Sequence, residues 1–170
     1  MRSDYYRIPG PWLGSLATGP RPRGGDWLED EVRVWCAAGV TDVVSLLTPS
    51  EVIELELEAE SASCRKNGIT FHSMPVPDRG LPPSGRAFDA LVDVLRTAVS
   101  SGRSVLVHCR QGIGRASLVA VSLLIRAGYD PDAALASVAQ ARGRNVPDTD
   151  EQRDWLRARR AGQAASFDVR

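Results

Sequence analysis

The sequence has few of the features that define membrane, secreted and metal-dependent proteins. No apolar run approaches the roughly 20 residues that cross a bilayer, and Met1–Asp4 lacks the apolar core of a signal peptide. Three widely spaced cysteines, an odd number, argue against a disulfide framework, and two histidines do not indicate a zinc site. We therefore expect a cytoplasmic protein without a membrane segment, a metal ion or another cofactor.

The sequence also lacks an excess of either charge. Its 21 basic residues, of which only Lys66 is a lysine, balance 21 acidic ones, which argues against nucleic acid as a partner. Hydrophobic residues make up 43% and charged residues 25% of the 170, a composition typical of a globular protein. We expect one domain over residues 1–161 and a flexible tail over residues 162–170. The oligomeric state is left open.

Strand-like and helix-like segments alternate along the chain. The expected strands are 5–8, 12–17, 41–47, 69–73 and 104–108. The expected helices are 26–38, 51–60 with a continuation to 67, 84–100, 115–127, 131–142 and 150–160, with Asp26 and Ser50 as caps of the first two. This order predicts an α/β fold with a mainly parallel sheet of about four to five strands and helices on both faces.

The most informative segment is His108–Ala116, which reads HCRQGIGRA. An apolar run precedes it and a long apolar helix follows, so it forms a tight loop between a strand and a helix. Such a loop turns backbone N–H groups inward, and the helix adds its unpaired N–H groups and the positive end of its dipole. The segment therefore predicts an anion-binding loop that carries a thiol and a guanidinium.

Each residue type in the loop suits attack by a thiolate on a phosphate ester. Converging N–H groups, the helix N-terminus and Arg115 favour the ionised form of Cys109. Arg115 offers parallel donors to two phosphate oxygens, and Gly112 and Gly114 allow positive φ and close approach of the backbone. A lone cysteine at a strand end is usually inert, and Gly-x-Gly alone is common. The combination points to function. The predicted phosphate-binding loop is Arg110, Gln111, Gly112, Ile113, Gly114 and Arg115.

The segment resembles the signature of the cysteine-dependent protein tyrosine phosphatases, His-Cys-x5-Arg, and the compact chain resembles their dual-specificity branch. The resemblance extends from about Tyr6 to Trp155. It implies that Cys109 is the nucleophile that forms a phosphocysteine and that Arg115 binds the phosphoryl group. The family usually has Ser or Thr after the arginine, where this chain has Ala116, and Ser117 points about 100° further round the helix. We therefore expect the intermediate to form normally and to decay slowly.

Asp78 is the predicted general acid. It lies in a loop rich in proline between the strand 69–73 and the helix 84–100, thirty-one residues before Cys109. The resemblance implies that the acid occupies such a loop, about thirty residues before the nucleophile, and that Asp78 then activates water for the second step. The alternative is that Asp78 is only a turn residue. Asp89 and Asp93 are interpreted as solvated positions of the next helix.

Several other polar residues have two interpretations each. His108 should face away from the thiol, because neighbours on a strand point to opposite sides, and should support the loop by a hydrogen bond. Gln152 either helps to orient water or is an exposed helix residue. Glu51 and its neighbours are interpreted as a solvated helix face. Cys36 and Cys64 are expected to fill space, although either is a candidate partner for oxidised Cys109.

The loop also bears on the substrate. It offers Arg110 but no lysine, and Gln111 and Ile113 are neutral, which favours a phosphorylated protein over a highly charged lipid headgroup. We expect a tyrosine or dual-specificity phosphatase. The alternatives are a phosphoinositide or RNA 5′-triphosphate phosphatase on the same fold, a rhodanese-like sulfurtransferase, and a non-catalytic phosphate-binding module. Arsenate reductases of the low-molecular-weight type place the cysteine before the acid, opposite to the order here.

Overall fold

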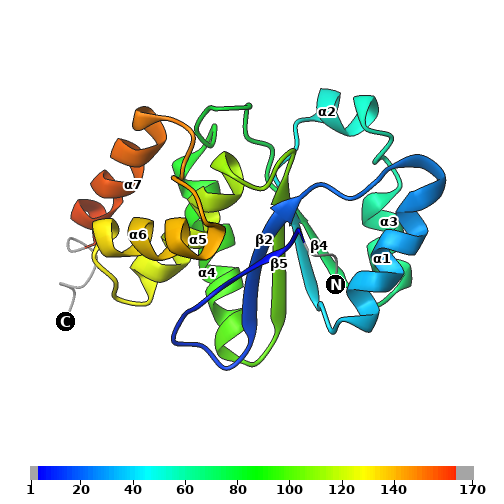
Figure 1. The fold of residues 1–170 in the computed structure, drawn as a ribbon, viewed down its shortest axis with the longest axis horizontal. Coiled ribbons are helices and arrows are strands. Elements are labelled where there is room, and N and C mark those ends of the chain that lie inside the picture. Colours follow the sequence, from blue (N-terminus) through cyan, green and yellow to red (C-terminus); the bar gives the residue numbers. More distant parts are fainter. Residues whose placement is uncertain (1–3, 164–170) are drawn as a thin grey trace.

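The computed structural model describes residues 4–163 and contains one five-stranded sheet (Figure 1). In chain order the strands are β1 (Tyr6–Ile8), β2 (Ser15–Pro20), β3 (Asp42–Ser45), β4 (Thr70–Ser73) and β5 (Ser104–Cys109). Their order across the sheet is β1-β2-β5-β3-β4, with β1 antiparallel to β2 and all other pairs parallel. The expected α/β fold with a mainly parallel sheet is confirmed.

Helices cover both faces of the sheet. Figure 1 shows one group on one side and the other group opposite. The first group is α1 (Leu28–Ala37), preceded by a 3₁₀ turn at Gly25–Trp27, with α2 (Pro49–Glu54) and α3 (Glu60–Lys66). The second group is α4 (Gly85–Ser100), α5 (Gly114–Arg126), α6 (Pro131–Arg142) and α7 (Asp150–Gln163). No helix among residues 4–163 is long and apolar enough to cross a membrane.

The alternation of side chains along β5 separates two hydrophobic cores. Val105, Val107 and Cys109 face the core under α4–α7, whereas Leu106 faces the core under α1 and α3. Because successive strand residues point to opposite faces, His108 shares the second side and the Cys109 thiol lies on the first. The expected separation of the His108 ring from the thiol is therefore confirmed.

Two element boundaries differ from those expected. The second strand runs over Ser15–Pro20 rather than 12–17, because parallel pairing with β5 sets its register, with Pro20 opposite Cys109. Trp12 lies outside the strand and packs against the larger core. Pairing with a distant strand is not visible in the local pattern of residues 12–17.

The expected acidic helix is two helices. The chain leaves α2 after Glu54, passes through Glu56 at a φ of 55°, and resumes as α3 at Glu60. This bend lets Leu57 enter the core under α1. The cap of α2 is Thr48 rather than Ser50, and its hydroxyl accepts a hydrogen bond from the backbone N–H of Glu51. Asp26 lies within the 3₁₀ turn rather than at a helix cap.

The C-terminal helix extends further than expected. α7 continues to Gln163, so residues 162 and 163 of the expected tail are helical. The rest of that tail, residues 164–170, lies outside the described residues.

Candidate active site

A polar cavity of about 210 Å³ opens at the carboxyl end of β5, beside the loop that follows β4, at the edge where open α/β sheets bind ligands. The residues that line it come from three loops. They are the loop between β4 and α4 that carries Asp78, here called the acid loop, residues 110–115 after β5, here called the phosphate loop, and the loop before α7. The lining residues are Asp78, Arg79, Cys109, Arg110, Gln111, Ile113, Gly114, Arg115 and Asp148. The cavity therefore brings Cys109, Arg115 and Asp78 together from segments far apart in the sequence.

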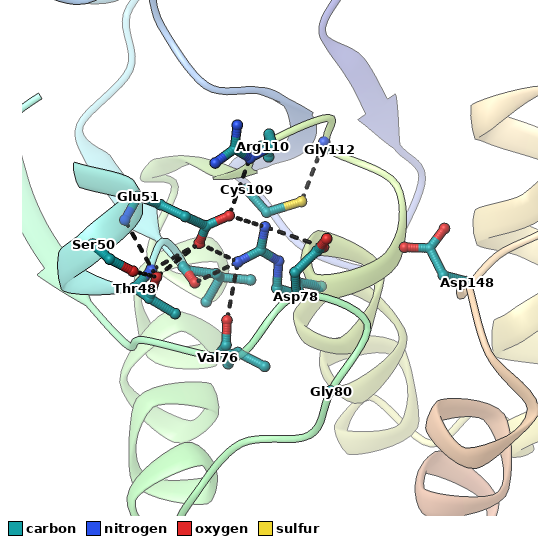
Figure 2. Close-up of polar contacts among 12 residues, drawn as sticks. Thr48, Ser50, Glu51, Val76, Asp78, Gly80, Cys109, Arg110, Gly112 and Asp148 are labelled. Carbon is teal, nitrogen blue, oxygen red and sulfur yellow. Dashed lines mark hydrogen bonds and ion pairs between the residues drawn. The ribbon is translucent and has the colours of Figure 1, made fainter. Parts of the chain in front are cut away.

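Cys109 ends β5 and lies at the start of the phosphate loop, 3% exposed. The backbone N–H of Gly112 donates a hydrogen bond to its sulfur at 3.2 Å (Figure 2). Gly112 has a φ of 69°, and any side chain there would collide with the backbone of Gly19 at the end of β2. The loop is thus braced against the neighbouring strand with an amide hydrogen directed at the sulfur.

Arg115 lies in the first turn of α5, and its guanidinium is 2% exposed. Its Nη1 donates to a Glu51 oxygen at 2.7 Å and to the carbonyl of Val76 at 3.0 Å, and its Nη2 donates to the other Glu51 oxygen at 2.9 Å. None of these contacts uses Nε. Nη2 also lies 3.4 Å from Oδ1 of Asp78. Since a guanidinium carries five N–H groups in a fixed plane, Nε and the second Nη2 hydrogen form a fork on this side that can bind an oxyanion.

Glu51 is the main site residue that the sequence interpretation missed. It was interpreted as part of a solvated face, but it is 7% exposed and makes a two-pronged ion pair with Arg115. The hydrogen bonds from Arg115 lower the pKa of Glu51 to about 2, with further help from the Thr48 backbone and Arg110. The partners lie 64 residues apart, so a local acidic pattern gives no sign of the pairing.

Arg110 turns away from the centre of the phosphate loop toward α2 (Figure 2). Its Nε donates to Glu51 at 3.2 Å, and its two terminal nitrogens bind Glu54 at 3.2 and 2.8 Å. Hydrogen bonds from Arg110 lower the pKa of Glu54. The cation that the sequence offered for a second phosphate group is therefore neutralised by two carboxylates of the protein.

Asp78 lies on the loop that follows β4. The preceding Val76 is buried, and its N–H donates to the carbonyl of Leu46 at 3.1 Å, which fixes the base of the loop. The Asp78 side chain is 64% exposed, and its Oδ1 lies 3.4 Å from Nη2 of Arg115. Arg79 beside it has a φ of 57°, a backbone conformation that residues other than glycine rarely adopt. The loop is thus anchored on one side and directs polar groups into the cavity on the other.

Gln152 is fully buried, so the interpretation as an exposed helix residue is wrong. Its Oε1 accepts hydrogen bonds from the backbone N–H groups of Asp148 and Thr149 at 3.1 and 3.3 Å. Its Nε2 donates to the carbonyl of Gly80, in the acid loop, at 2.9 Å. Gln152 therefore ties two loops of the cavity together and does not line the cavity itself.

His108 bonds a carboxylate rather than the phosphate loop. Its Nε2 lies 2.7 Å from Oε1 of Glu60 in α3, with both side chains buried. Its ring also lies 6.3 Å from that of Trp35. The expected hydrogen bond to the loop is absent from the contacts of the described residues, because the ring is on the α3 side of the sheet.

A second buried arginine lies near Cys109. Arg142, at the end of α6, is 7% exposed and stacks 3.7 Å from the centre of the Tyr6 ring. Burial lowers the pKa of Arg142, and the nearby Tyr6 and Cys109 oppose that shift. The sequence interpretation did not assign this buried arginine.

The position after Arg115 offers no hydroxyl to the sulfur. Ala116 is fully buried, and the hydroxyl of Ser117 donates to the carbonyl of Ile113. The expectation that Ser117 is a poor substitute for the family hydroxyl agrees with this contact.

The other cysteines lie on the opposite side of the sheet. Cys64 is buried in the core under α1, and burial, with the charge of Glu60, raises the pKa of its thiol to about 12. Cys36 is exposed and donates to the carbonyl of Asn67 at 3.4 Å. Because the Cys109 thiol faces the other core, neither is positioned to form a disulfide with it.

The described residues contain no cluster of three or more histidine, cysteine or carboxylate side chains that could hold a metal ion. The cations of the cavity are arginines, and its anion-binding groups are guanidinium and amide hydrogens.

Comparison with known proteins defines the family. Residues 14–168 match the PTP-SAK family, described as Swiss Army Knife protein, DSP-PTPase phosphatase domain. The chain belongs to this family of dual-specificity-type phosphatase domains. The sequence resemblance to the cysteine-dependent phosphatases is therefore confirmed.

Two mammalian proteins are similar to this chain in sequence. Cyclin-dependent kinase inhibitor 3 of Rattus norvegicus is 29% identical over 136 residues, which are 79% of this chain and 64% of that protein. Protein tyrosine phosphatase type IVA 3 of Bos taurus is 32% identical over 89 residues, 51% of each chain. The chain thus spans less than two thirds of the length of these relatives.

Solved structures share the fold. Kinase associated phosphatase, with its catalytic-site cysteine substituted by serine, superposes with a TM-score of 0.83 at 21% identity, covering 98% of this chain and 100% of that one. The active form of Tk-PTP gives 0.72 at 25% identity, over 95% and 99% of the two chains. PTPMT1 in complex with PI(5)P gives 0.76 at 20% identity, over 95% and 97%.

Proposed function

We propose that this protein is a cysteine-dependent phosphatase that hydrolyses phosphate monoesters of phosphorylated proteins, on tyrosine or with dual specificity, through a phosphocysteine. The observation that carries the proposal is the Cys109 sulfur, which accepts an amide hydrogen in a cavity that it shares with Arg115 and Asp78. Membership of a phosphatase-domain family supports the reaction class.

In the first step the thiolate of Cys109 attacks phosphorus, and the bond to the leaving oxygen breaks. The free fork of Arg115 and the amide hydrogens of the loop bind the phosphoryl oxygens as their charge develops. Asp78, at the mouth of the cavity, donates a proton to the leaving oxygen. Glu51 is a positioning residue, since it holds the guanidinium plane of Arg115 from behind.

In the second step water attacks the phosphocysteine and the sulfur leaves as a thiolate. Ala116 supplies no hydroxyl to that sulfur, and Gly112 N–H is its hydrogen-bond donor among the described residues. This supports slow decay of the intermediate. The requirement for a reduced thiol supports action in the cytoplasm.

The preference for a phosphoprotein rests on the charges around the cavity. A headgroup with several phosphates needs free cations, but Arg110 is paired with both acidic residues of α2, Glu51 and Glu54. A single phosphate monoester needs only the phosphate loop and Arg115. These contacts support a monophosphorylated side chain over a polyphosphorylated lipid.

The test is a panel of a phosphotyrosine peptide, a phosphothreonine peptide and a phosphoinositide at equal concentration, with thiosulfate and cyanide to detect sulfur transfer. We expect the highest kcat/KM for the phosphotyrosine peptide, and loss of turnover in Cys109→Ser with retained binding of vanadate. Cys36→Ser, which removes an exposed thiol, is the control and should match the wild type. Turnover by Cys109→Ser would contradict the assignment of the nucleophile, and preference for the phosphoinositide would contradict the substrate class.

A further inference from the structure

We propose that Asp148 is the base that activates water for hydrolysis of the phosphocysteine, so that the acid of the first step and the base of the second are different carboxylates. This inference rests on the phosphatase function proposed above. It assigns a catalytic role to a residue outside the signature loop and the acid loop.

The first observation is the position of Asp148. It lines the same cavity as Cys109, Arg115 and Asp78, from the loop that precedes α7. Figure 2 shows its carboxylate directed at the phosphate loop, on the side opposite Glu51. Its Oδ2 lies so close to the first residue of α5 that a β-carbon on Gly114 would collide with it. The absence of a side chain at Gly114 therefore makes room for this carboxylate beside the loop.

The second observation is that the Asp148 carboxylate has no cation or hydrogen-bond donor among the side chains that the structure describes, those of residues 4–159, although it is exposed at the cavity. Its counterpart Asp78 lies 3.4 Å from the Arg115 guanidinium. A free carboxylate here repels the phosphate ester and weakens substrate binding. A role in the reaction accounts for its presence at the cavity. Its free lone pairs are suited to accept a hydrogen bond from water.

The third observation is that the backbone of Asp148 is fixed relative to the acid loop. Buried Gln152 accepts the N–H of Asp148 at 3.1 Å and donates to the carbonyl of Gly80 at 2.9 Å. Gly80 lies two residues after Asp78, so one side chain holds the loops of both carboxylates. This fixed geometry is what a general base needs to hold water in one place.

The chemistry of the second step follows from this placement. Once the leaving group has departed, water enters the mouth of the cavity, opposite the sulfur. Its oxygen attacks phosphorus, its proton passes to Asp148, and the sulfur–phosphorus bond breaks with its electron pair returning to Cys109 as a thiolate. Inorganic phosphate then leaves, and Asp148 releases the proton to solvent. This chain needs activation of the water more than a chain with Ser or Thr after the arginine, because Ala116 offers the departing sulfur no hydroxyl.

The experiment separates the two steps by rapid mixing with an activated aryl phosphate, followed by acid quench and measurement of the phosphoenzyme. For Asp148→Asn we expect a burst with the amplitude and rate of the wild type, a fall of at least about ten-fold in steady-state turnover, and accumulation of phosphoenzyme. Added formate, a small base, should restore part of the turnover of Asp148→Ala without changing the burst.

The matched control is Asp150→Asn, which changes an exposed carboxylate two residues away that pairs with Arg153 and does not line the cavity. It should leave both steps unchanged. Dephosphorylation of Asp148→Asn at the wild-type rate, or failure of formate to rescue Asp148→Ala, would overturn the role of Asp148 and leave the proposed function intact. A wild-type enzyme that never forms phosphoenzyme during turnover would overturn the proposed function itself.

Discussion

The two sides of the cavity differ in how their charges are compensated. One side, here called the paired wall, consists of Arg110 and Arg115, which line the cavity, and of Glu51 and Glu54 behind them, whose ion pairs join α2 to the phosphate loop. The other, the carboxylate wall, consists of Asp78 and Asp148. Asp78 lies 3.4 Å from Arg115, whereas Asp148 forms no ion pair with the side chains that the structure describes. The residues proposed to hold the anion are therefore fixed by mutual pairing, while those proposed to move protons are open to water.

The largest expected effect comes from the carboxylate wall. Asp78→Ala should lower kcat/KM for alkyl phosphates by about 10²–10⁴-fold, because the leaving oxygen loses its proton donor. Activated aryl phosphates, whose leaving groups need little protonation, should lose far less. Steady-state kinetics on both substrate types provide the measurement, and Asp93→Ala in α4 is the control. Equal losses on the two substrates would remove Asp78 from the role of acid.

The paired wall should show its effect first in stability. Glu51→Gln removes the two-pronged ion pair of the buried Arg115 guanidinium and leaves the exposed Asp78, 3.4 Å from Nη2, as its nearby carboxylate, and we expect a loss of about 3 kcal/mol in the free energy of unfolding. Urea denaturation measures this loss. The control Glu54→Gln removes the other carboxylate bound to Arg110, which is exposed, and should change stability little. Similar losses in the two variants would mean that burial of the Glu51–Arg115 pair has no special weight.

The same pair predicts a dependence on pH. The pKa of Glu51 is about 2 in the folded protein, below its ordinary value of 4.5, so the unfolded chain binds more protons between these values. The stabilisation is complete above about pH 4.5 and is lost as the pH falls toward about 2. Glu51→Gln should therefore reduce the acid dependence of unfolding, and an unchanged acid slope would contradict the assignment.

The smallest expected effect is a gain in turnover from a substitution at Ala116, the residue after Arg115. Ala116→Ser places a hydroxyl beside the departing sulfur and should raise steady-state turnover several-fold, with less phosphoenzyme at steady state. Ala120→Ser, one turn later in the same buried helix, controls for the added hydroxyl. If Ala116→Ser leaves the rate of dephosphorylation unchanged, the second step is not limited by the leaving sulfur.

Much of the fold followed from local patterns. Apolar strands, glycine and proline boundaries and the buried run of α5 predicted the order of the elements and the parallel sheet, because these signals lie within each segment. The start of β2 and the break at Glu56 were not predicted from the sequence. The first depends on pairing with β5 and the second on entry of Leu57 into a core, and both involve distant residues.

The site divides in the same way. The spacing within nine residues placed Cys109 and Arg115 on one loop, and the structure brings both into one cavity with Asp78. Glu51 and Asp148 were not predicted from the sequence, since an isolated carboxylate in an acidic helix or before a helix matches many solvated positions. Sequence shows which groups exist, but the partners of Glu51 and the burial of Gln152 arise only when separate loops meet.

The amide of Gln152 has a mechanical consequence. A single planar group of three heavy atoms joins the carbonyl of Gly80 to the start of α7. Any movement of the acid loop that keeps this link must also move the segment around Asp148. The two loops would therefore open and close the cavity together rather than independently. Binding of a ligand to one loop would then change the position of the other.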